Sequence, residues 1–215
     1  PSQTRWAAVQ GDFITDNDDA VAVINVEGAT PAAAVTVSTP LTTGTSLVGT
    51  GTTSNGVRRD VQFSASGVAF LGDFATDGVT ELFYGDLSGA SPGATQTVNG
   101  ALVLDGDVQD FLMSPDGSRI AYVADETTDA INELYVVDIT GGTVGAPQRV
   151  NAALSGSSDV TNDDYYWSPD SRFLAYLADP VASGPEEPVL VGMGDGTPTG
   201  NQVNPPLSRP PSSRD

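Results

Sequence analysis

The sequence predicts an all-β protein, a β-propeller built of about four blades with four strands each. One short phrase recurs as Asp60-Val-Gln-Phe-Ser-Ala-Ser-Gly, Asp110-Phe-Leu-Met-Ser-Pro-Asp-Gly and Asp164-Tyr-Tyr-Trp-Ser-Pro-Asp-Ser. The copies begin 50 and 54 residues apart, a period typical of propellers and solenoids. No stretch of the chain keeps a helical spacing of apolar residues over ten positions free of Gly and Pro.

Each repeat continues through three further strand-like runs in a fixed order. An alternating run that ends in Asp follows the phrase, at 68–73, 120–125 and 174–179. A polar loop leads to a third run at 81–86, 133–138 and 187–192, and a last short strand ends at 98–102, 150–154 and 203–207. Short runs divided by Gly, Pro, Asp and Ser, four to a repeat, are typical of propeller blades.

The N-terminal segment is a fourth, diverged copy that begins inside the turn after the first strand. Its runs at 6–9, 21–25 and 34–37 take the second, third and fourth strand positions, so we expect the first blade to lack its innermost strand. The blades then comprise residues 1–41, 42–102, 103–154 and 155–207. A Thr-rich insertion covers 42–56, and 208–215 form a Pro- and Ser-rich linker or tail.

Three arrangements account for the missing strand. The chain is an excerpt of a longer propeller, or a nearly closed four-bladed ring, or a neighbouring subunit completes the ring by supplying a strand. An unpaired sheet edge accepts a strand through main-chain hydrogen bonds. The third arrangement places a protein partner, including copies of this chain, at the open blade edge near Trp6, Ala7, Ala8 and Val9.

Two of the repeats resemble those of a known family. Trp167-Ser-Pro-Asp-Ser-Arg-Phe-Leu-Ala-Tyr-Leu-Ala-Asp179 and its counterpart Met113-Ser-Pro-Asp-Gly-Ser-Arg-Ile-Ala-Tyr-Val-Ala-Asp125 resemble the TolB-type β-propeller repeat, as does Glu133-Leu-Tyr-Val-Val-Asp-Ile-Thr-Gly-Gly142. The second copy matches loosely and the first in outline, so nearly the whole chain to Leu207 is covered. The resemblance implies the fold but no binding site, because such repeats occur in periplasmic TolB, in the propellers of prolyl oligopeptidase-like enzymes and in many secreted proteins.

The residue types that the sequence lacks argue against an enzyme. The 215 residues include no Cys, His or Lys, and all eight positive charges are Arg. A Ser-His-Asp triad, a thiolate or imidazole metal site, a Schiff-base lysine and a P-loop are therefore impossible within this sequence. We predict no catalytic and no cofactor-binding residues, and a structural role at strand ends and turns for the repeated acids Asp60, Asp73, Asp110, Asp125, Asp164 and Asp179.

The charge and hydropathy of the chain limit its partners further. The net charge of −20 argues against nucleic acid as a partner, because binding to phosphates needs positive patches. No run approaches eighteen apolar residues, so we expect no membrane insertion. The sequence begins with Pro rather than Met, which indicates a processed or excerpted form, and we expect an extracellular or periplasmic location.

Calcium is the one ligand with local support in the sequence. The candidate ligands Asp12, Asp16, Asp18 and Asp19 crowd one loop between strands. Oxygen ligands at alternate positions suit a hard cation in a flexible loop, although plain turn chemistry also accounts for them. Two further acidic clusters are Asp105, Asp107 and Asp110, and Asp125, Glu126 and Asp129.

From these observations we predict a non-enzymatic, exported, acidic propeller that serves as a protein-interaction or structural scaffold and self-assembles by strand sharing. Two alternatives stay open. The chain is the non-catalytic propeller domain of a larger prolyl oligopeptidase-like hydrolase, which predicts further chain with a nucleophile and a His. Or it is a calcium-dependent binding or adhesion module, which predicts a melting temperature that rises with calcium.

Overall fold

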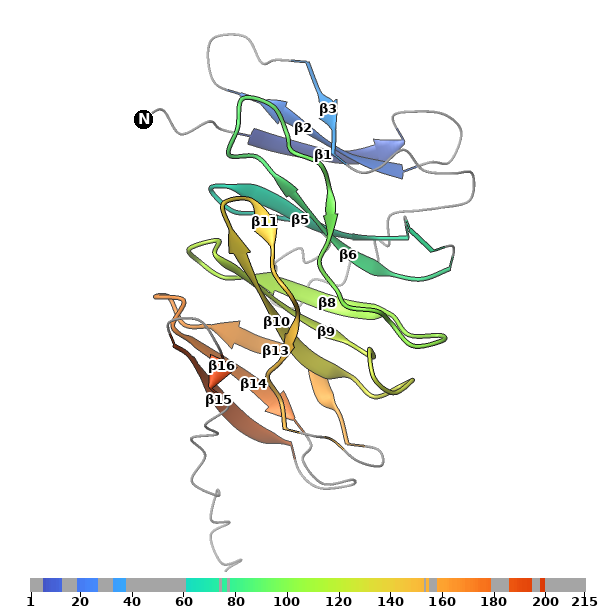
Figure 1. The fold of residues 1–215 in the computed structure, drawn as a ribbon, viewed down its shortest axis with the longest axis vertical. Helices are drawn as coiled ribbons and strands as arrows, with labels where there is room; N and C mark the ends of the chain where they lie inside the picture. The colour runs from blue at the N-terminus through green and yellow to red at the C-terminus, as the bar shows by residue number, and fades with distance from the viewer. Residues whose placement is uncertain are drawn as a thin grey trace, which may run out of the picture.

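The computed structural model describes residues 6–12, 19–26, 33–37, 61–73, 75–76, 78–152, 154, 158–178, 186–194 and 198–199. Within these ranges every regular element is a β-strand, and the strands form four antiparallel sheets. Figure 1 shows the sheets stacked in chain order, from the β1–β3 sheet at one end to the β13–β16 sheet at the other. The chain is an all-β propeller whose four blades correspond to the four repeats.

The first two blades differ in their number of strands. The first is a three-stranded sheet of β1 (Trp6–Asp12), β2 (Asp19–Asn25) and β3 (Val35–Thr36). The second has four strands, β4 (Val61–Phe63), β5 (Gly67–Gly72), β6 (Glu81–Asp86) and β7 (Gln96–Thr97). In the described residues the first blade thus lacks the innermost strand that β4 provides in the second blade, as predicted.

The third and fourth blades follow the best copies of the repeat. The third contains β8 (Val108–Met113), β9 (Arg119–Ala124) and β10 (Glu133–Thr140), with the two-residue strands β11 (Thr143–Val144) and β12 (Gln148–Arg149) both paired to β10. The fourth contains β13 (Val160–Trp167), β14 (Phe173–Ala178), β15 (Glu187–Met193) and β16 (Pro198–Thr199). The predicted insertion at 42–56 and the tail at 208–215 lie outside the described residues.

The hydrophobic core lies between successive sheets. Side chains of a strand alternate between its two faces, so each blade has a back face toward the preceding blade and a forward face toward the next. The forward face of the third blade, formed by Ala121, Val123, Leu134 and Val136, packs on the back face of the fourth, which includes Tyr165, Leu174, Tyr176 and Val191. Ala69, Leu71, Leu82 and Tyr84 of the second blade pack in the same way on Phe111, Ile120, Tyr122 and Tyr135 of the third.

Burial on both faces explains why the middle strands of the repeat are almost wholly apolar. All six residues of β5 are buried, and so are five of the six in β9. The first and second blades share a smaller cluster, in which Val21, Val23 and Val37 meet Val68, Phe70 and Phe83. A propeller of this kind has no single central core, and each blade depends on its neighbours for burial.

Side chains also join the innermost strands of adjacent blades to one another. The amide of Gln62 donates to the carbonyl oxygen of Phe111 (2.7 Å) and accepts from the amide of Met113 (2.9 Å). On the other side of β8, the indole of Trp167 donates to the carbonyl oxygen of Leu112 (3.1 Å). Three blades are therefore tied together along their inner strands.

Candidate functional site

The calcium candidates are only partly within the described residues. Asp12 and Asp19 form the last register pair of the β1–β2 ladder, so that 13–18 connect the two strands. Asp16 and Asp18 lie outside the described residues. In the part of the chain that the structure describes, no three acidic, His or Cys side chains come together in a way that could hold a metal ion. Calcium binding at this loop stays a prediction.

Two acids of the second and third clusters, Asp107 and Asp125, bind main-chain amides. Asp107 Oδ1 accepts from the amide of Thr80 in the preceding blade (2.6 Å). Asp125 accepts from the amides of Asp107 (2.6 Å) and Ala130 (3.1 Å). The fourth blade repeats the first of these contacts, because Asp159 Oδ1 accepts from the amide of Asn132 (2.6 Å). Asp107 and Asp159 thus each bind an amide of the preceding blade, whereas Asp125 binds amides of its own blade, a structural role of the kind predicted for it.

Asparagines at the end of the repeat have a parallel role. Asn99 accepts from the amide of Leu82 (2.8 Å), and Asn151 accepts from the amide of Leu134 (2.8 Å). Each asparagine thus fixes the short outer segment of its blade to the third strand. Sequence reasoning assigned no role to these residues, although their recurrence before Ala or Gly at the end of the repeat is a readable signal.

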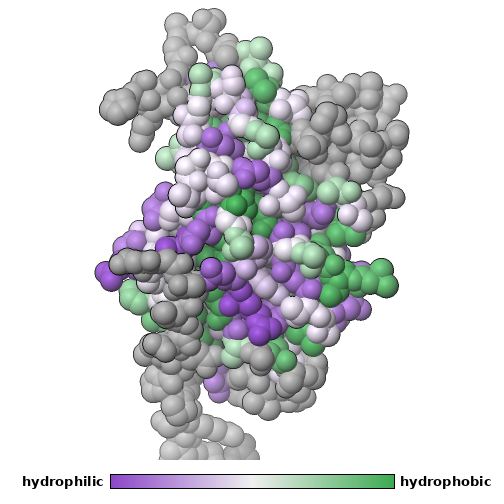
Figure 2. Space-filling view, in the orientation of Figure 1, coloured by the Kyte–Doolittle hydropathy of each residue, from purple (hydrophilic) through white to green (hydrophobic). Residues whose placement is uncertain are grey.

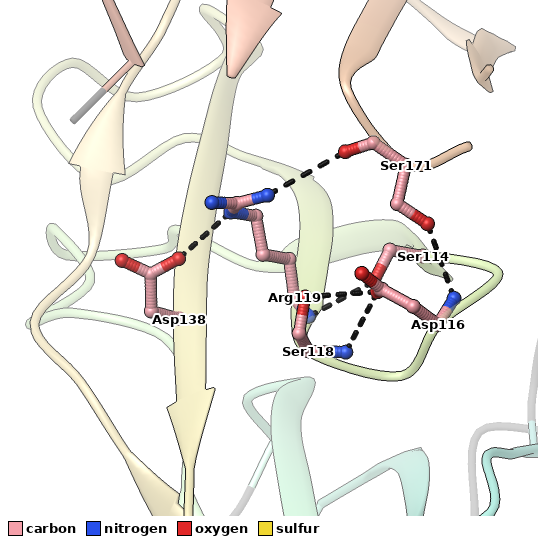
Figure 3. A network of polar contacts seen from close by, with 6 residues as sticks. All are labelled: Ser114, Asp116, Ser118, Arg119, Asp138 and Ser171. Atoms are coloured by element: carbon pink, nitrogen blue, oxygen red, sulfur yellow. Dashed lines mark hydrogen bonds and ion pairs between the residues drawn. The ribbon is translucent and has the colours of Figure 1, made fainter. Parts of the chain in front are cut away.

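The Ser-Pro-Asp-Gly segments form tight corners between the first and second strands, as predicted. Figure 3 shows the corner of the third blade, where the hydroxyls of Ser114 and Ser118 donate to Asp116 Oδ1 at 2.7 and 2.8 Å. The amide of Ser118 also donates to this oxygen (3.0 Å). Gly117 follows with φ of +71°, a left-handed conformation that glycine adopts without strain.

These contacts hold the Asp116 carboxyl in its ionised form. Partial burial alone would raise its pKa, but the hydrogen bonds from Ser118 and Ser114 outweigh burial and hold the pKa below its ordinary value. The corner of the fourth blade is similar, since the hydroxyl of Ser168 donates to Asp170 (2.6 Å) and lowers the pKa of that exposed carboxyl. Both carboxylates therefore serve their own turns.

The corners of adjacent blades contact each other through Ser171. The amide of Asp116 donates to Ser171 Oγ (3.1 Å), and the guanidinium of Arg119 reaches the carbonyl oxygen of Ser171 (3.5 Å) while it pairs with Asp138 (2.8 Å), as Figure 3 shows. Ser171 itself has a positive φ of +59°, at the position that Gly117 occupies in the third blade. Sequence reasoning did not find this contact.

Beside this contact lies an open hollow of about 390 Å³. Its lining combines charged and apolar side chains from the third and fourth blades, namely Asp116, Arg119, Asp170, Arg172, Phe173 and Met193. The guanidinium of Arg172 lies 6.0 Å from the centre of the Phe173 ring. The two carboxylates of this hollow, Asp116 and Asp170, each accept hydrogen bonds within their own turns.

A second hollow, of about 530 Å³, lies where the second blade leads into the third. Its lining combines apolar side chains, among them Val79, Leu102 and Leu104, with polar ones such as Glu81 and Asn99. Leu104 is 85% exposed, and Figure 2 shows hydrophobic surface protruding at the level of these blades.

A buried polar cluster lies behind this hollow. Glu126 Oε1 accepts from the Tyr122 hydroxyl (2.6 Å) and from the amide of Gly100 in the second blade (2.7 Å). Burial raises the pKa of Glu126 above its ordinary value, against the opposing effect of these two hydrogen bonds. The ring of Tyr135 stacks on that of Tyr122, with 5.3 Å between the ring centroids. The hydroxyl of Tyr135 donates to Glu133 (2.8 Å).

The predicted open edge lies on β1. In the described residues β1 pairs with β2 alone, from Trp6 to Asp12, whereas the second strands of the other three blades are paired on both sides. The indole of Trp6 donates to the carbonyl oxygen of Leu87 (3.0 Å) and packs toward the second blade. Side chains of Ala7, Ala8 and Val9 lie outside the described part.

Comparison with known proteins gives no family. No protein-family model matches the chain, and no curated protein matches it. Among solved structures, one from a structural and mechanistic study of two prolyl endopeptidases is similar at 16% identity over 87% of this chain and 23% of that chain, with a TM-score of 0.49. A post-proline cleaving enzyme from Rickettsia typhi is similar at 7% identity over 80% and 23%, with a TM-score of 0.48.

A puromycin-hydrolysing peptidase of Mycobacterium tuberculosis is similar at 14% identity over 93% of this chain and 30% of that chain, with a TM-score of 0.49. The present chain thus spans less than a third of the length of each of these solved chains. Among the described residues no helix is long and apolar enough to cross a membrane.

Proposed function

We propose that this propeller is a non-catalytic domain of a larger prolyl oligopeptidase-like hydrolase. One observation carries the non-catalytic part: at repeat-equivalent places the described acids bind main-chain amides and turn hydroxyls, as Asp107, Asp116, Asp125 and Asp159 do. Carboxylates engaged in this way stabilise their own turns and loops or join adjacent blades. The resemblance of the Ser-Pro-Asp repeats to propellers of such hydrolases supports the rest.

The fold suits a domain that acts by contact. Core clusters, inner-strand hydrogen bonds and corner contacts join the stacked sheets to one another. The sequence contains no His. Its Gly89-Ala-Ser-Pro-Gly93 segment matches the Gly-x-Ser-x-Gly pattern, but it lies between the strands β6 and β7 and no helix follows it, so it does not form a nucleophile elbow. The reaction would therefore reside in another part of the polypeptide. The role of this domain would then be to cover or orient the catalytic part.

The test is the hydrolysis of a fluorogenic Gly-Pro substrate. The 215-residue chain alone is expected to show no turnover, whereas the complete polypeptide that contains it is expected to hydrolyse the substrate. Replacing the nucleophilic Ser of the complete polypeptide with Ala is the matched control and should abolish turnover. A complete polypeptide without a hydrolase domain would refute the proposal.

Strand sharing at β1 is the second candidate function, favoured by the one-sided pairing of β1 in the described residues. A strand from another chain would take the place that β4, β8 and β13 hold in their own blades. A synthetic peptide with the sequence of residues 110–115 should bind the chain saturably, while a scrambled peptide should not. Equal binding of the two peptides would exclude sequence-specific strand addition at this edge.

A further inference from the structure

The two ends of the blades differ in charge. At one end lie the connections from the second strand to the third and from the fourth strand to the next blade. We call this the loop end, and it comprises the described residues within 73–81, 99–107, 125–133 and 151–159. At the other end, the corner end, lie the corners between first and second strands and the turns that follow the third strands. In Figure 1 the loop end is on the right and the corner end on the left.

Acidic side chains gather at the loop end. Its described acids are Asp73, Glu81, Asp105, Asp107, Asp125, Glu126, Asp129, Glu133 and Asp159. The sequence places no Arg in these four ranges, and the nearby Arg149 is already paired with Glu133. The corner end is more balanced, and its described charged residues are Asp86, Asp116, Arg119, Asp138, Asp170 and Arg172. In the described part of the chain, negative charge is thus concentrated at the loop end.

The acids of the loop end repel one another. Burial raises the pKa of Glu126 and that of Asp159, and a neighbouring negative charge raises each pKa further, that of Glu133 in the first case and that of Asp125 in the second. Positive charges on a partner would relieve this repulsion. A single metal ion would relieve it less well, because no three of the described acidic side chains come together in a way that could hold one.

The loop end also carries the most exposed large apolar side chain of the described residues. Leu104 is 85% exposed, whereas the next most exposed, Tyr166, is 45% exposed. Leu104 borders the hollow of about 530 Å³, and Leu102 lines it as well. Two acids, Glu81 and Asp105, belong to the same lining, which includes no positively charged residue. Apolar surface and negative charge therefore meet at this hollow.

We propose that the loop end docks a basic segment of a partner protein, which places one large apolar side chain in the hollow beside Leu104 and flanking Lys or Arg side chains near Asp105 and Glu126. The hydrogen bond from the amide of Gly100 to Glu126 (2.7 Å) brings this acid to the wall of the hollow. Burial of the apolar side chain supplies affinity, and the opposite charges around it select the partner. The inference is independent of the proposed function, because it involves no hydrolysis.

The test uses the 215-residue chain and two synthetic peptides with the same fluorescent label, Arg-Arg-Leu-Arg-Arg and Arg-Arg-Ser-Arg-Arg. Fluorescence anisotropy at low salt should show saturable binding of both peptides. The Leu peptide should bind about tenfold more tightly, because it alone can bury an apolar side chain. The binding of both should weaken as sodium chloride screens the charges. Glu-Glu-Leu-Glu-Glu, which has the apolar residue without the positive charges, should not bind.

Matched variants locate the docking surface. Leu104→Ser should weaken binding of the Leu peptide about fivefold and leave binding of the Ser peptide unchanged, a coupling expected if the two leucines are in contact. Asp105→Asn should weaken binding of both peptides about two- to fivefold. Asn tolerates the φ of +63° at this position, so the variant keeps its local backbone. Asp138→Asn removes the same charge from the corner end and should weaken binding of both peptides clearly less.

Three outcomes would overturn the inference. They are the absence of saturable binding, equal affinity for the Leu and Ser peptides, and equal losses of affinity in the Asp105→Asn and Asp138→Asn variants. The second outcome would mean that the hollow takes no apolar side chain, and the third that the peptides respond to the net charge of the whole chain. If the complete polypeptide hydrolyses the Gly-Pro substrate but the chain gives one of these outcomes, the docking surface is wrong and the proposed function stands.

Discussion

The third and fourth blades have nearly the same repeat sequence but very different surroundings. Of the second strands, β9 is buried at five of its six positions, whereas β14 alternates between buried and more exposed residues. The back faces of both blades are equally well covered, as Tyr122 and Tyr176 show at 0 and 2% exposed. Burial therefore depends on whether a further sheet packs on the blade, and the repeat itself specifies only which side chains point forward.

The largest expected effect comes from removing the same side chain on the two forward faces. Leu134→Ala, in the third blade, should lower the free energy of unfolding by about 2–5 kcal/mol, because it leaves a cavity in a closed core. Leu190→Ala, in the fourth blade, should cost less than about 1 kcal/mol, because this side chain is 37% exposed. Urea denaturation of both variants measures the difference, and equal losses would contradict the comparison.

The two corners provide the next test. Gly117→Ala should destabilise the fold by about 1–3 kcal/mol, because the residue has a left-handed backbone. An added Cβ would also lie 2.5 Å from the Cβ of Ser64. Ser171→Gly relieves the same backbone strain but removes the acceptor of the Asp116 amide, so it should change the melting temperature little. A neutral Gly117→Ala variant would show that the corner tolerates side chains.

Glu126 in the third blade should make the free energy of unfolding depend on pH. Its pKa is raised on folding, so the folded state binds this proton more tightly than the unfolded state. The free energy of unfolding should therefore fall as pH rises from the ordinary value of 4.5 through the raised pKa.

Glu126→Gln keeps an acceptor for the Gly100 amide and removes the titration. The variant should match the wild type at low pH and become relatively more stable as pH rises to about 7. Urea denaturation at several pH values measures this gap. If the difference in the free energy of unfolding between variant and wild type does not widen with pH, the fold does not raise the pKa of Glu126.

The smallest expected effect concerns the ion pair that the fourth blade lacks. Asp138→Asn breaks the contact with Arg119, but Asp138 is well exposed and solvent screens the pair. The loss should be below about 1 kcal/mol and should shrink further at high salt. A larger loss in thermal denaturation would mean that the corner contact of Arg119 with Ser171 depends on this pair.

The sequence could predict the blades but only part of their connections. The period of the repeat and the alternation of apolar residues predicted the order of the strands. The Ser-Pro-Asp segments predicted the turns between the first and second strands. Two adjacent tyrosines show that side chains alternate between the two faces of a strand, since Tyr165 is buried and Tyr166 is exposed. Contacts such as Gln62 with β8, or Ser171 with Asp116, join residues about 50 apart through side chains that a single repeat does not mark.

The candidate site was harder to predict for a physical reason. Acidic residues at strand ends have the same local sequence whether they bind a cation or a main-chain amide, and only the neighbouring blade decides between these roles. Asp107 and Asp159 illustrate this, because their partners Thr80 and Asn132 each lie 27 residues earlier in the chain. The exposure of the forward face of the fourth blade likewise depends on whether a further sheet covers it, and the fourth repeat does not encode this.

The side chain of Gln62 covers part of the inner edge of β8 with its two hydrogen bonds. Its amide donates to one peptide group of β8 and accepts from another, and so imitates one rung of a β-ladder. These two peptide groups on the inward margin of the third blade are therefore occupied within the molecule and cannot pair with a strand of another molecule.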